Sequence, residues 1–201
     1  MSWNTPSHRT TGTLITASIW NTDVIDNLIA LRSISSVIEL SGAGFWPSTT
    51  SGCVGAAQTE LGTNKVNYKC VSFVKSVTTY AEVEIPAMPS DWDSGSLTAV
   101  FAWNGGADTS TNSVIWGIQG RCYGDGDALD QAMGTAQEVT DNNASTANQE
   151  RISAATAAIT LAGTPAPGKK AHIRIYRKGA SDTMANTAYL DGGVVLTYSR
   201  A

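Results

Sequence analysis

The sequence predicts an all-β protein, a jelly-roll-like antiparallel β-sandwich with a short N-terminal helix. Beyond residue 45, stretches in which apolar and polar residues alternate recur about eight times, with turn residues between them. No helical pattern separates these stretches, which argues against the strand–helix alternation of a parallel α/β sheet. Only the chain before residue 45 has a helical period. We therefore divide the chain into an N-terminal segment, residues 1–44, and a jelly-roll domain, residues 45–201.

The one convincing helix is expected over residues 17–31. Thr16 can cap its first turn, because a threonine hydroxyl accepts a free backbone amide there. Four apolar residues recur at helical spacing and form one face: Trp20, Val24, Leu28 and Leu31. A helix of this length is marginal alone in water, so this face must rest on the domain, on another copy or on another protein. Its place before a break at Gly42, Gly44 and Pro47 favours the last two.

The strand patterns occupy most of the remaining chain. The clearest cover residues 66–73, 81–85, 96–103, 113–123, 171–177 and 194–198, with a weaker one at 136–140. Residues 151–159, rich in Ala and Thr, suit either strand or helix. Strands at this spacing are typical of a sandwich or jelly roll.

The charge pattern argues against nucleic-acid binding. Thirteen basic and 17 acidic residues give a net charge of −4. The closest approach to a basic cluster is Lys169, Lys170, Arg174, Arg177 and Lys178. Neighbouring positions on a strand point to opposite faces, so these five do not form one patch. Binding to phosphates needs a concentrated positive field, which this chain lacks.

The first residues and the cysteines predict a chain that is made in a cytoplasm. Residues 1–6 have no basic start and no apolar run, so we expect no secretory signal. No apolar stretch approaches 18 residues, so we expect no membrane insertion. Three cysteines, Cys53, Cys70 and Cys122, leave at least one unpaired, and we expect all three to be free, buried thiols.

Few residues are available for nucleophilic catalysis. The two histidines are His8, near the start, and His172, between Ala171 and Ile173 in a predicted strand. A Ser-His-Asp or Cys-His site would need His172 as its base. We expect instead a strand histidine with a local partner. The three cysteines also lack the spacing of a zinc site, so we predict no metal, no cofactor and no catalytic residue.

The acidic loop 124–130 (GDGDALD) allows three interpretations. Glycosidases use two carboxylates, and Asp125, Asp127 and Asp130 could supply them. The spacing also resembles a calcium loop, but the twelve-residue pattern lacks its final Glu and no helix precedes it. We favour an ordinary solvated turn. Three tryptophans could stack on sugars, although core packing is the favoured role: Trp92, Trp103 and Trp116.

Two parts of the chain resemble the tail and fibre proteins of tailed bacteriophages. Residues 11–21 (TGTLITASIWN), leading into 26–31 (DNLIAL), resemble their N-terminal segment, in which G-x-L-T-A-x-x-W/L-N leads into R/D-D-N-L-x-A-L. Ile25 stands where an arginine often precedes the Asp. The later stretches resemble their jelly-roll domain: 114–117 (VIWG), 124–130 with Gly134, 139–141 (VTD), 159–168 (ITLAGTPAPG), 173–177 (IRIYR), Asp182 and Tyr198. Residues 45–65 match nothing in that pattern.

The resemblance implies a structural protein of the virion, assembled in the host cytoplasm. It implies a homotrimeric tail or baseplate fibre subunit, joined to other virion proteins through the N-terminal segment and able to bind a host surface saccharide through the jelly roll. The family also includes head fibres and capsid decoration proteins, so the place on the particle stays open. A carbohydrate-binding module and a glycan-cleaving enzyme on a β-scaffold are the remaining alternatives.

Overall fold

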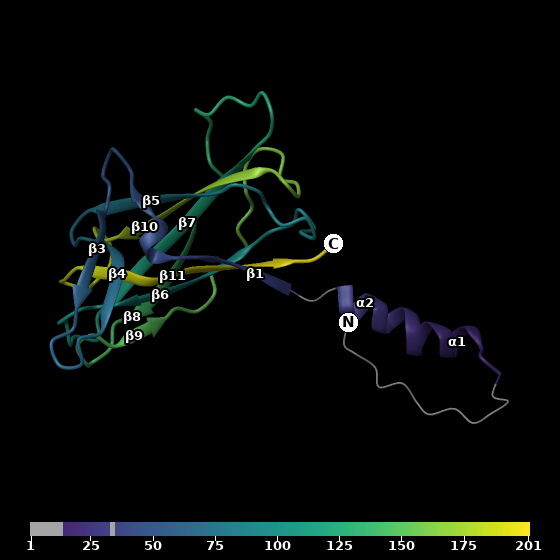
Figure 1. The fold of residues 1–201 in the computed structure, drawn as a ribbon, viewed down its shortest axis with the longest axis horizontal. Helices are drawn as coiled ribbons and strands as arrows, with labels where there is room; N and C mark the ends of the chain where they lie inside the picture. Colours follow the sequence, from purple (N-terminus) through teal and green to yellow (C-terminus); the bar gives the residue numbers. More distant parts are fainter. Residues whose placement is uncertain (1–13, 33–34) are drawn as a thin grey trace.

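The computed structural model describes residues 14–32 and 35–201, and within them two antiparallel sheets face each other (Figure 1). Sheet A contains β3 (Val54–Glu60), β4 (Asn67–Phe73), β11 (Ala188–Ser199), β6 (Thr98–Asn104) and β9 (Glu150–Ile152), in that order, with β1 (Ser35–Leu40) also paired to β11. Sheet B contains β2 (Trp46–Pro47), β5 (Thr78–Ile85), β10 (Lys170–Lys178), β7 (Ser113–Tyr123) and β8 (Gln137–Asn142). The predicted all-β sandwich is confirmed.

The predicted helix is present. It comprises α1 (Ala17–Trp20), a five-residue π-helical turn η1 (Asn21–Ile25) and α2 (Asp26–Arg32). The backbone amide of Ile19 donates to the Thr16 hydroxyl at 3.3 Å, which is the expected N-cap. Figure 1 shows this helical segment extending away from the sandwich beyond the start of β1. Among the described residues, no helix is both long and apolar enough to cross a bilayer.

The sandwich includes residues before position 45, where the sequence predicted the start of the jelly-roll domain. Ser35–Leu40 pairs with β11, and both Leu40 and Phe45 lie in the core. The glycines expected to separate two units instead form η2 (Gly42–Gly44), a short turn between β1 in sheet A and β2 in sheet B. Gly42 is required there, because a Cβ on it would lie 2.0 Å from the carbonyl oxygen of Leu190.

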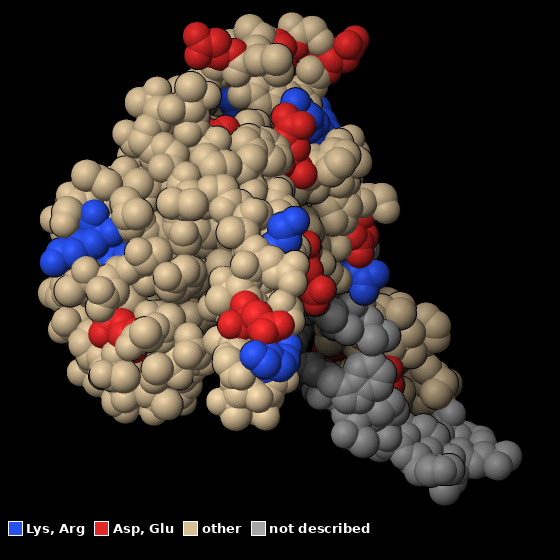
Figure 2. Space-filling view, turned by 60° about the vertical axis from the view of Figure 1, so that its left-hand side comes forward, with Lys and Arg blue, Asp and Glu red and all other residues tan. Residues whose placement is uncertain are grey.

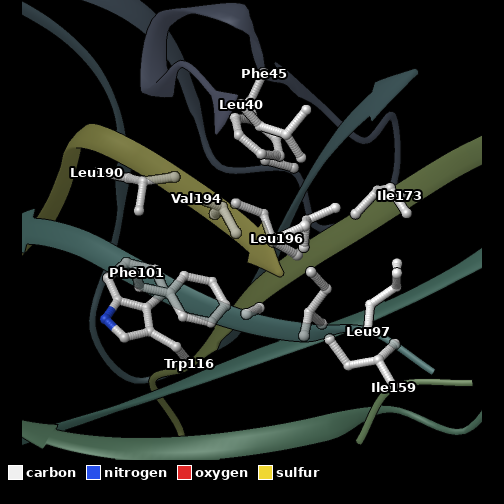
Figure 3. Close-up of a cluster of buried hydrophobic side chains, with 14 of the residues drawn as sticks. Leu40, Phe45, Leu97, Phe101, Trp116, Ile159, Ile173, Leu190, Val194 and Leu196 are labelled. Atoms are coloured by element: carbon white, nitrogen blue, oxygen red, sulfur yellow. The ribbon is translucent and has the colours of Figure 1, made fainter. Parts of the chain in front are cut away.

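The core between the sheets is centred on Trp116 of β7. Its ring stacks on Phe101 of β6 at 5.4 Å between centroids (Figure 3). It also contacts the rings of Phe73 and Trp103 edge-on. Trp92, Trp103 and Trp116 are each at most 1% exposed, so the expected packing role of the three tryptophans is confirmed. Each such side chain contributes about 1.5–3 kcal/mol or more through burial.

The three cysteines Cys53, Cys70 and Cys122 are free and buried, as expected. Burial raises the pKa of Cys53 to about 12 and that of Cys70 to about 11. A thiol with so high a pKa is protonated at neutral pH and is a poor nucleophile. These side chains therefore serve packing.

One buried ion pair joins the two sheets. The Arg177 guanidinium of β10 donates to both carboxylate oxygens of Asp182, at 2.7 and 3.0 Å, and both side chains are fully buried. Its other hydrogen bonds go to the backbone carbonyls of Phe73, Met184 and Asn186. All five N–H groups thus have acceptors, the condition under which burying a guanidinium is tolerated. Phe73 belongs to sheet A, so this contact ties β10 to the opposite sheet and holds the 182–186 loop.

Replacing Arg177 with Met is expected to lower the free energy of unfolding by about 3–5 kcal/mol, because Asp182 and three carbonyls lose a buried partner. Lys178→Met is the matched control. Lys178 is the next residue of the same strand and pairs at the surface with Glu138, and such pairs contribute about 0–1 kcal/mol. Urea denaturation followed by tryptophan fluorescence measures both. Equal, small losses in the two variants would contradict a central role for Arg177.

Candidate functional site

A polar groove crosses the outer face of sheet B. Alternation along β5 and β10 points one set of side chains into the core and the other into this groove. One hollow of about 470 Å³ is lined by Glu82, Glu84, Gln119, Tyr123, Leu129, Asp130, Gln131, Ala132, Met133, Lys170, His172 and Arg174. A second, of about 490 Å³, is lined by Ser48, Thr49, Thr50, Ser51, Tyr80, Glu82 and Arg174. Because the hollows share Glu82 and Arg174, we treat them as one site, called the sheet B groove.

The loop after β7 forms one wall of the groove, and β7 itself holds it in place. The Arg121 guanidinium donates to the carbonyl of Ala132 at 2.9 Å and to the side-chain oxygen of Gln131 at 3.1 Å. The Tyr123 hydroxyl donates to the carbonyl of Leu129 at 2.8 Å. Three hydrogen bonds from the strand thus fix residues 129–132 beside the floor.

The floor is a set of cross-strand ion pairs. Arg174 lies opposite Glu82, and His172 lies opposite Glu84, in the register of β10 and β5. Glu82 accepts hydrogen bonds from Ser48 at 2.6 Å and Arg174 at 3.0 Å, and its other oxygen contacts His172 Nε2. Glu84 pairs with Lys170 at 2.9 Å, and His172 Nδ1 lies 3.6 Å away. Opposite charges on adjacent strands therefore hold one another in fixed positions.

These partners keep both glutamates ionised at neutral pH. Burial by itself would raise the pKa of Glu82, but the hydrogen bonds from Ser48, His172 and Arg174 outweigh it and lower the pKa. The hydrogen bond from Lys170 is the main cause of the lowered pKa of Glu84. Neither carboxyl is a proton donor near neutral pH.

Two aromatic rings, Tyr80 and Tyr123, line the groove, and a third, Trp46, lies beside it against His172. Tyr80 forms part of the floor with the Arg174 guanidinium 5.8 Å from its centroid. Tyr123 has the Lys170 ammonium at 5.4 Å. Trp46 of β2 is 43% exposed and meets the His172 ring edge-on at 6.2 Å. The groove thus combines fixed donors and acceptors with apolar ring surface.

The partners of His172 lie on the adjacent strand β5. It contacts Glu82 and Glu84, while the Ser48 hydroxyl donates to Glu82 and not to the histidine. A nucleophilic serine needs a direct contact with its base, and this arrangement does not provide one. The other histidine, His8, lies outside the described residues.

The carboxylates of the acidic loop 124–130 do not come together at one site. Asp127 accepts from the backbone amide of Gly124 at 2.7 Å, as in an ordinary turn, and Asp130 lines the sheet B groove. Within residues 14–32 and 35–201, no three His, Cys, Asp or Glu side chains form a metal-binding group. On the face shown in Figure 2, acidic and basic side chains lie in small separate groups, with no broad basic area.

The predicted docking face of the helix is only partly covered. Trp20 is 53% and Leu28 52% exposed, and Val24 is partly buried. Leu31 lies in α2, although its side chain is outside the described part of the structure. Docking through this face stays a prediction.

One pair of carboxyl groups, on sheet A, was not predicted from the sequence. Glu150 of β9 interacts with Asp191, which lies in the irregularity of β11 between Tyr189 and Gly193. Partial burial, with a further contribution from the negative charge of Asp191, raises the pKa of Glu150 to about 7. Forty-one positions separate the two residues, and no motif marks them. Neither lines the sheet B groove.

Comparison with known proteins finds similarity only to solved structures, and not to protein families or curated sequences. The xylan-binding module CBM15 is 17% identical, with 83% of this chain and 99% of that chain covered and a TM-score of 0.44. A family 35 carbohydrate-binding module from Clostridium thermocellum is 11% identical, covering 82% and 98%, with a TM-score of 0.42. The family 11 module of a cellulosomal cellulase from the same organism is 10% identical, covering 84% and 97%, with a TM-score of 0.43.

The Glu150–Asp191 pair predicts a pH-dependent loss of stability. Folding raises the pKa of Glu150 from 4.5 to about 7, so the folded state binds this proton more tightly than the unfolded state. The stabilising contribution is therefore complete below about pH 4.5 and is lost as the pH rises to about 7. Glu150→Gln removes the titrating group and should raise the melting temperature relative to the parent at about pH 8, but not at about pH 4.

Differential scanning calorimetry at the two pH values measures this effect. Glu60→Gln, at an exposed pair with Lys65 on the same sheet, is the control and should show no such difference. An equal change for Glu150→Gln at both pH values would contradict the raised pKa.

Proposed function

We propose that this chain is a structural subunit of a bacteriophage virion, a trimeric tail or baseplate fibre subunit that displays its sandwich and attaches through its N-terminal helix. One observation supports this most strongly: an amphipathic helix with half-exposed Trp20 and Leu28 lies outside a sandwich that has its own core. The resemblance of residues 11–31 to the N-terminal segment of phage fibre proteins agrees with this observation.

The sandwich does not need the helix as part of its core. The buried apolar cluster runs from Leu40 to Tyr198 and draws no described residue from α1, η1 or α2. Exposed apolar side chains on a helix are costly in water, and each one that a partner buries fully contributes about 1.5–3 kcal/mol. Repeated over identical subunits, Trp20 and Leu28 can decide whether the protein stays on a particle.

A binding role for the sandwich is favoured over catalysis. Glycosidases need one carboxylic acid that is still protonated near the working pH beside an ionised carboxylate. In the sheet B groove, Glu82 and Glu84 both have lowered pKa values and are paired with cations. Glu150 has a raised pKa but belongs to the other sheet. We therefore propose a non-enzymatic protein that requires no cofactor or metal.

The same two-part arrangement would serve a capsid decoration protein, which also attaches through one element and displays another. The groove is the observation that favours a fibre, because a displayed subunit with a recessed polar surface suits contact with a host saccharide. Location on the particle separates these two candidates.

Deleting the helix is expected to abolish attachment without unfolding the sandwich. A chain that begins at residue 33 keeps β1 and the whole core, so it should keep a cooperative melt and a β-type circular dichroism spectrum. It should no longer incorporate into virions when it replaces the full chain. Quantitative mass spectrometry of purified particles measures incorporation.

A second truncation provides the control. A chain that begins at Phe45 also loses β1 and the buried Leu40, and should be less stable by several kcal/mol; loss of the buried leucine alone costs about 2–5 kcal/mol. If the chain from residue 33 is unfolded, the helix is part of the core and the two-part arrangement is wrong. Normal incorporation of that chain would exclude the helix as the attachment element.

The full chain is expected to be a homotrimer held in part by the apolar helix face. Light scattering at micromolar concentration should give about three times the chain mass of 21.0 kDa. Leu28→Asp places a charge on the apolar face and should shift the protein towards monomer, whereas Thr22→Asp, also at an exposed helix position, should not. A monomer at all concentrations, or equal effects of the two changes, would contradict this prediction.

A further inference from the structure

We infer that the sheet B groove is a binding site for a neutral oligosaccharide. The paired charges of β5 and β10 would hydrogen-bond to its hydroxyl groups, and the rings of Tyr80, Tyr123 and Trp46 would pack against its sugar rings. The inference deepens the proposed function, because it names the ligand of the displayed sandwich, but its test does not depend on virion assembly.

The shape of the groove suits an extended ligand. Its two hollows, of about 470 and 490 Å³, meet at Glu82 and Arg174. Each is within the usual range for small-molecule sites, roughly 300–1,000 Å³. The 129–133 loop bounds one end and the 48–51 loop the other, with the strands of sheet B between them. A chain of linked rings fills such a surface better than one compact molecule does.

The charges select a neutral and polar ligand. Three carboxylates line the groove, on Glu82, Glu84 and Asp130, and two permanent cations, Lys170 and Arg174, are paired with the first two. A phosphate or sulfate group would meet carboxylates and would have to displace existing ion pairs. An apolar ligand would cover charged groups without offering hydrogen bonds, which costs free energy.

Hydroxyl groups match this floor. A hydroxyl donates one hydrogen bond and accepts two, so it can bridge a carboxylate of β5 and a cation of β10 without breaking their pair. Glu84 and Lys170 are 42% and 34% exposed at their side chains, so both still have room for a further partner. A ligand with many hydroxyls could therefore add bonds to a network that is already formed.

The aromatic rings account for the apolar part of the ligand. Pyranose rings carry faces of C–H groups beside their hydroxyls, and such faces pack on aromatic rings. Tyr123 and Trp46 stand on different sides of the His172 and Glu84 pair, through their contacts with Lys170 and His172. Their orientations are held by contacts with Lys170 and His172, so little side-chain freedom would be lost on binding.

Binding of the full chain to an array of neutral, sulfated, phosphorylated and carboxylated oligosaccharides tests the inference, followed by titration calorimetry with the best neutral ligand. Tyr123→Ala and Glu84→Gln are each expected to weaken that ligand at least about tenfold, which is about 1.4 kcal/mol. Tyr123→Phe keeps the ring but removes the hydroxyl bond to Leu129, and should bind better than Tyr123→Ala.

Glu60→Gln is the matched control, because Glu60 is also an exposed strand glutamate paired with a lysine, on the other sheet. It should leave the affinity unchanged, and all variants should melt as the parent does. The inference is wrong if the chain binds only charged glycans or binds none. It is also wrong if Tyr123→Ala and Glu84→Gln leave the affinity for the neutral glycan unchanged. Any of these results together with normal virion incorporation would leave the virion role and attachment through the helix standing, and would remove the reason to prefer a fibre over a decoration protein.

Discussion

The buried Arg177–Asp182 pair is the contact on which the rest of the sandwich depends. A fully buried guanidinium is tolerated only when every N–H group has an acceptor, and Arg177 meets this condition with Asp182 and three backbone carbonyls. The contact reaches across the interior from β10 of sheet B to the end of β4 in sheet A. It thereby fixes the strand whose opposite face carries Lys170, His172 and Arg174, the residues that form the floor of the groove.

The inward and outward faces of β10 thus have separate roles. Ala171, Ile173 and Ile175 point inward and are almost completely buried, like Arg177. The outward residues pair with the glutamates of β5 rather than with solvent alone. A rigid strand is a better support for a binding surface than a loop, because its side chains keep their positions before the ligand arrives.

The helix presents the opposite situation. It has a capped start at Thr16 and an apolar face, but Trp20 and Leu28 remain half exposed. A short helix gains most of its stability from packing of that face. The exposed apolar surface that a partner would bury therefore lies on residues 17–32, whereas the sandwich buries its own apolar side chains in its core. This division is the basis for proposing attachment at one end of the chain and display at the other.

Much of the fold could be predicted from alternation and turn residues, because both act over a few positions. The capped helix, the buried tryptophans and the free thiols follow from such local patterns. β3 was missed because its sequence VGAAQTE has small and polar residues and lies at a sheet edge. β1 was missed because Gly42 and Gly44 indicate a break, whereas the close approach of Gly42 to Leu190 needs the folded chain.

The site was less predictable than the fold. The strand histidine His172 was expected to have a local partner, but its partners come from β5, about 90 residues earlier in the chain. Glu82, Ser48 and Trp46 carry no motif, and only strand pairing brings them to His172. Arg177 was expected to be one of several basic strand residues, and its position on the inward face became clear only from the contacts it makes across the core.

Cryo-electron microscopy of particles purified from cells that produce this chain tests the central claim most directly. The account predicts three copies of the chain together on the particle, with the apolar face of residues 17–32 buried against one another or a neighbouring virion protein and the sandwich projecting outward. Particles without the chain, or particles that contain it with Trp20 and Leu28 still exposed to solvent, would contradict it.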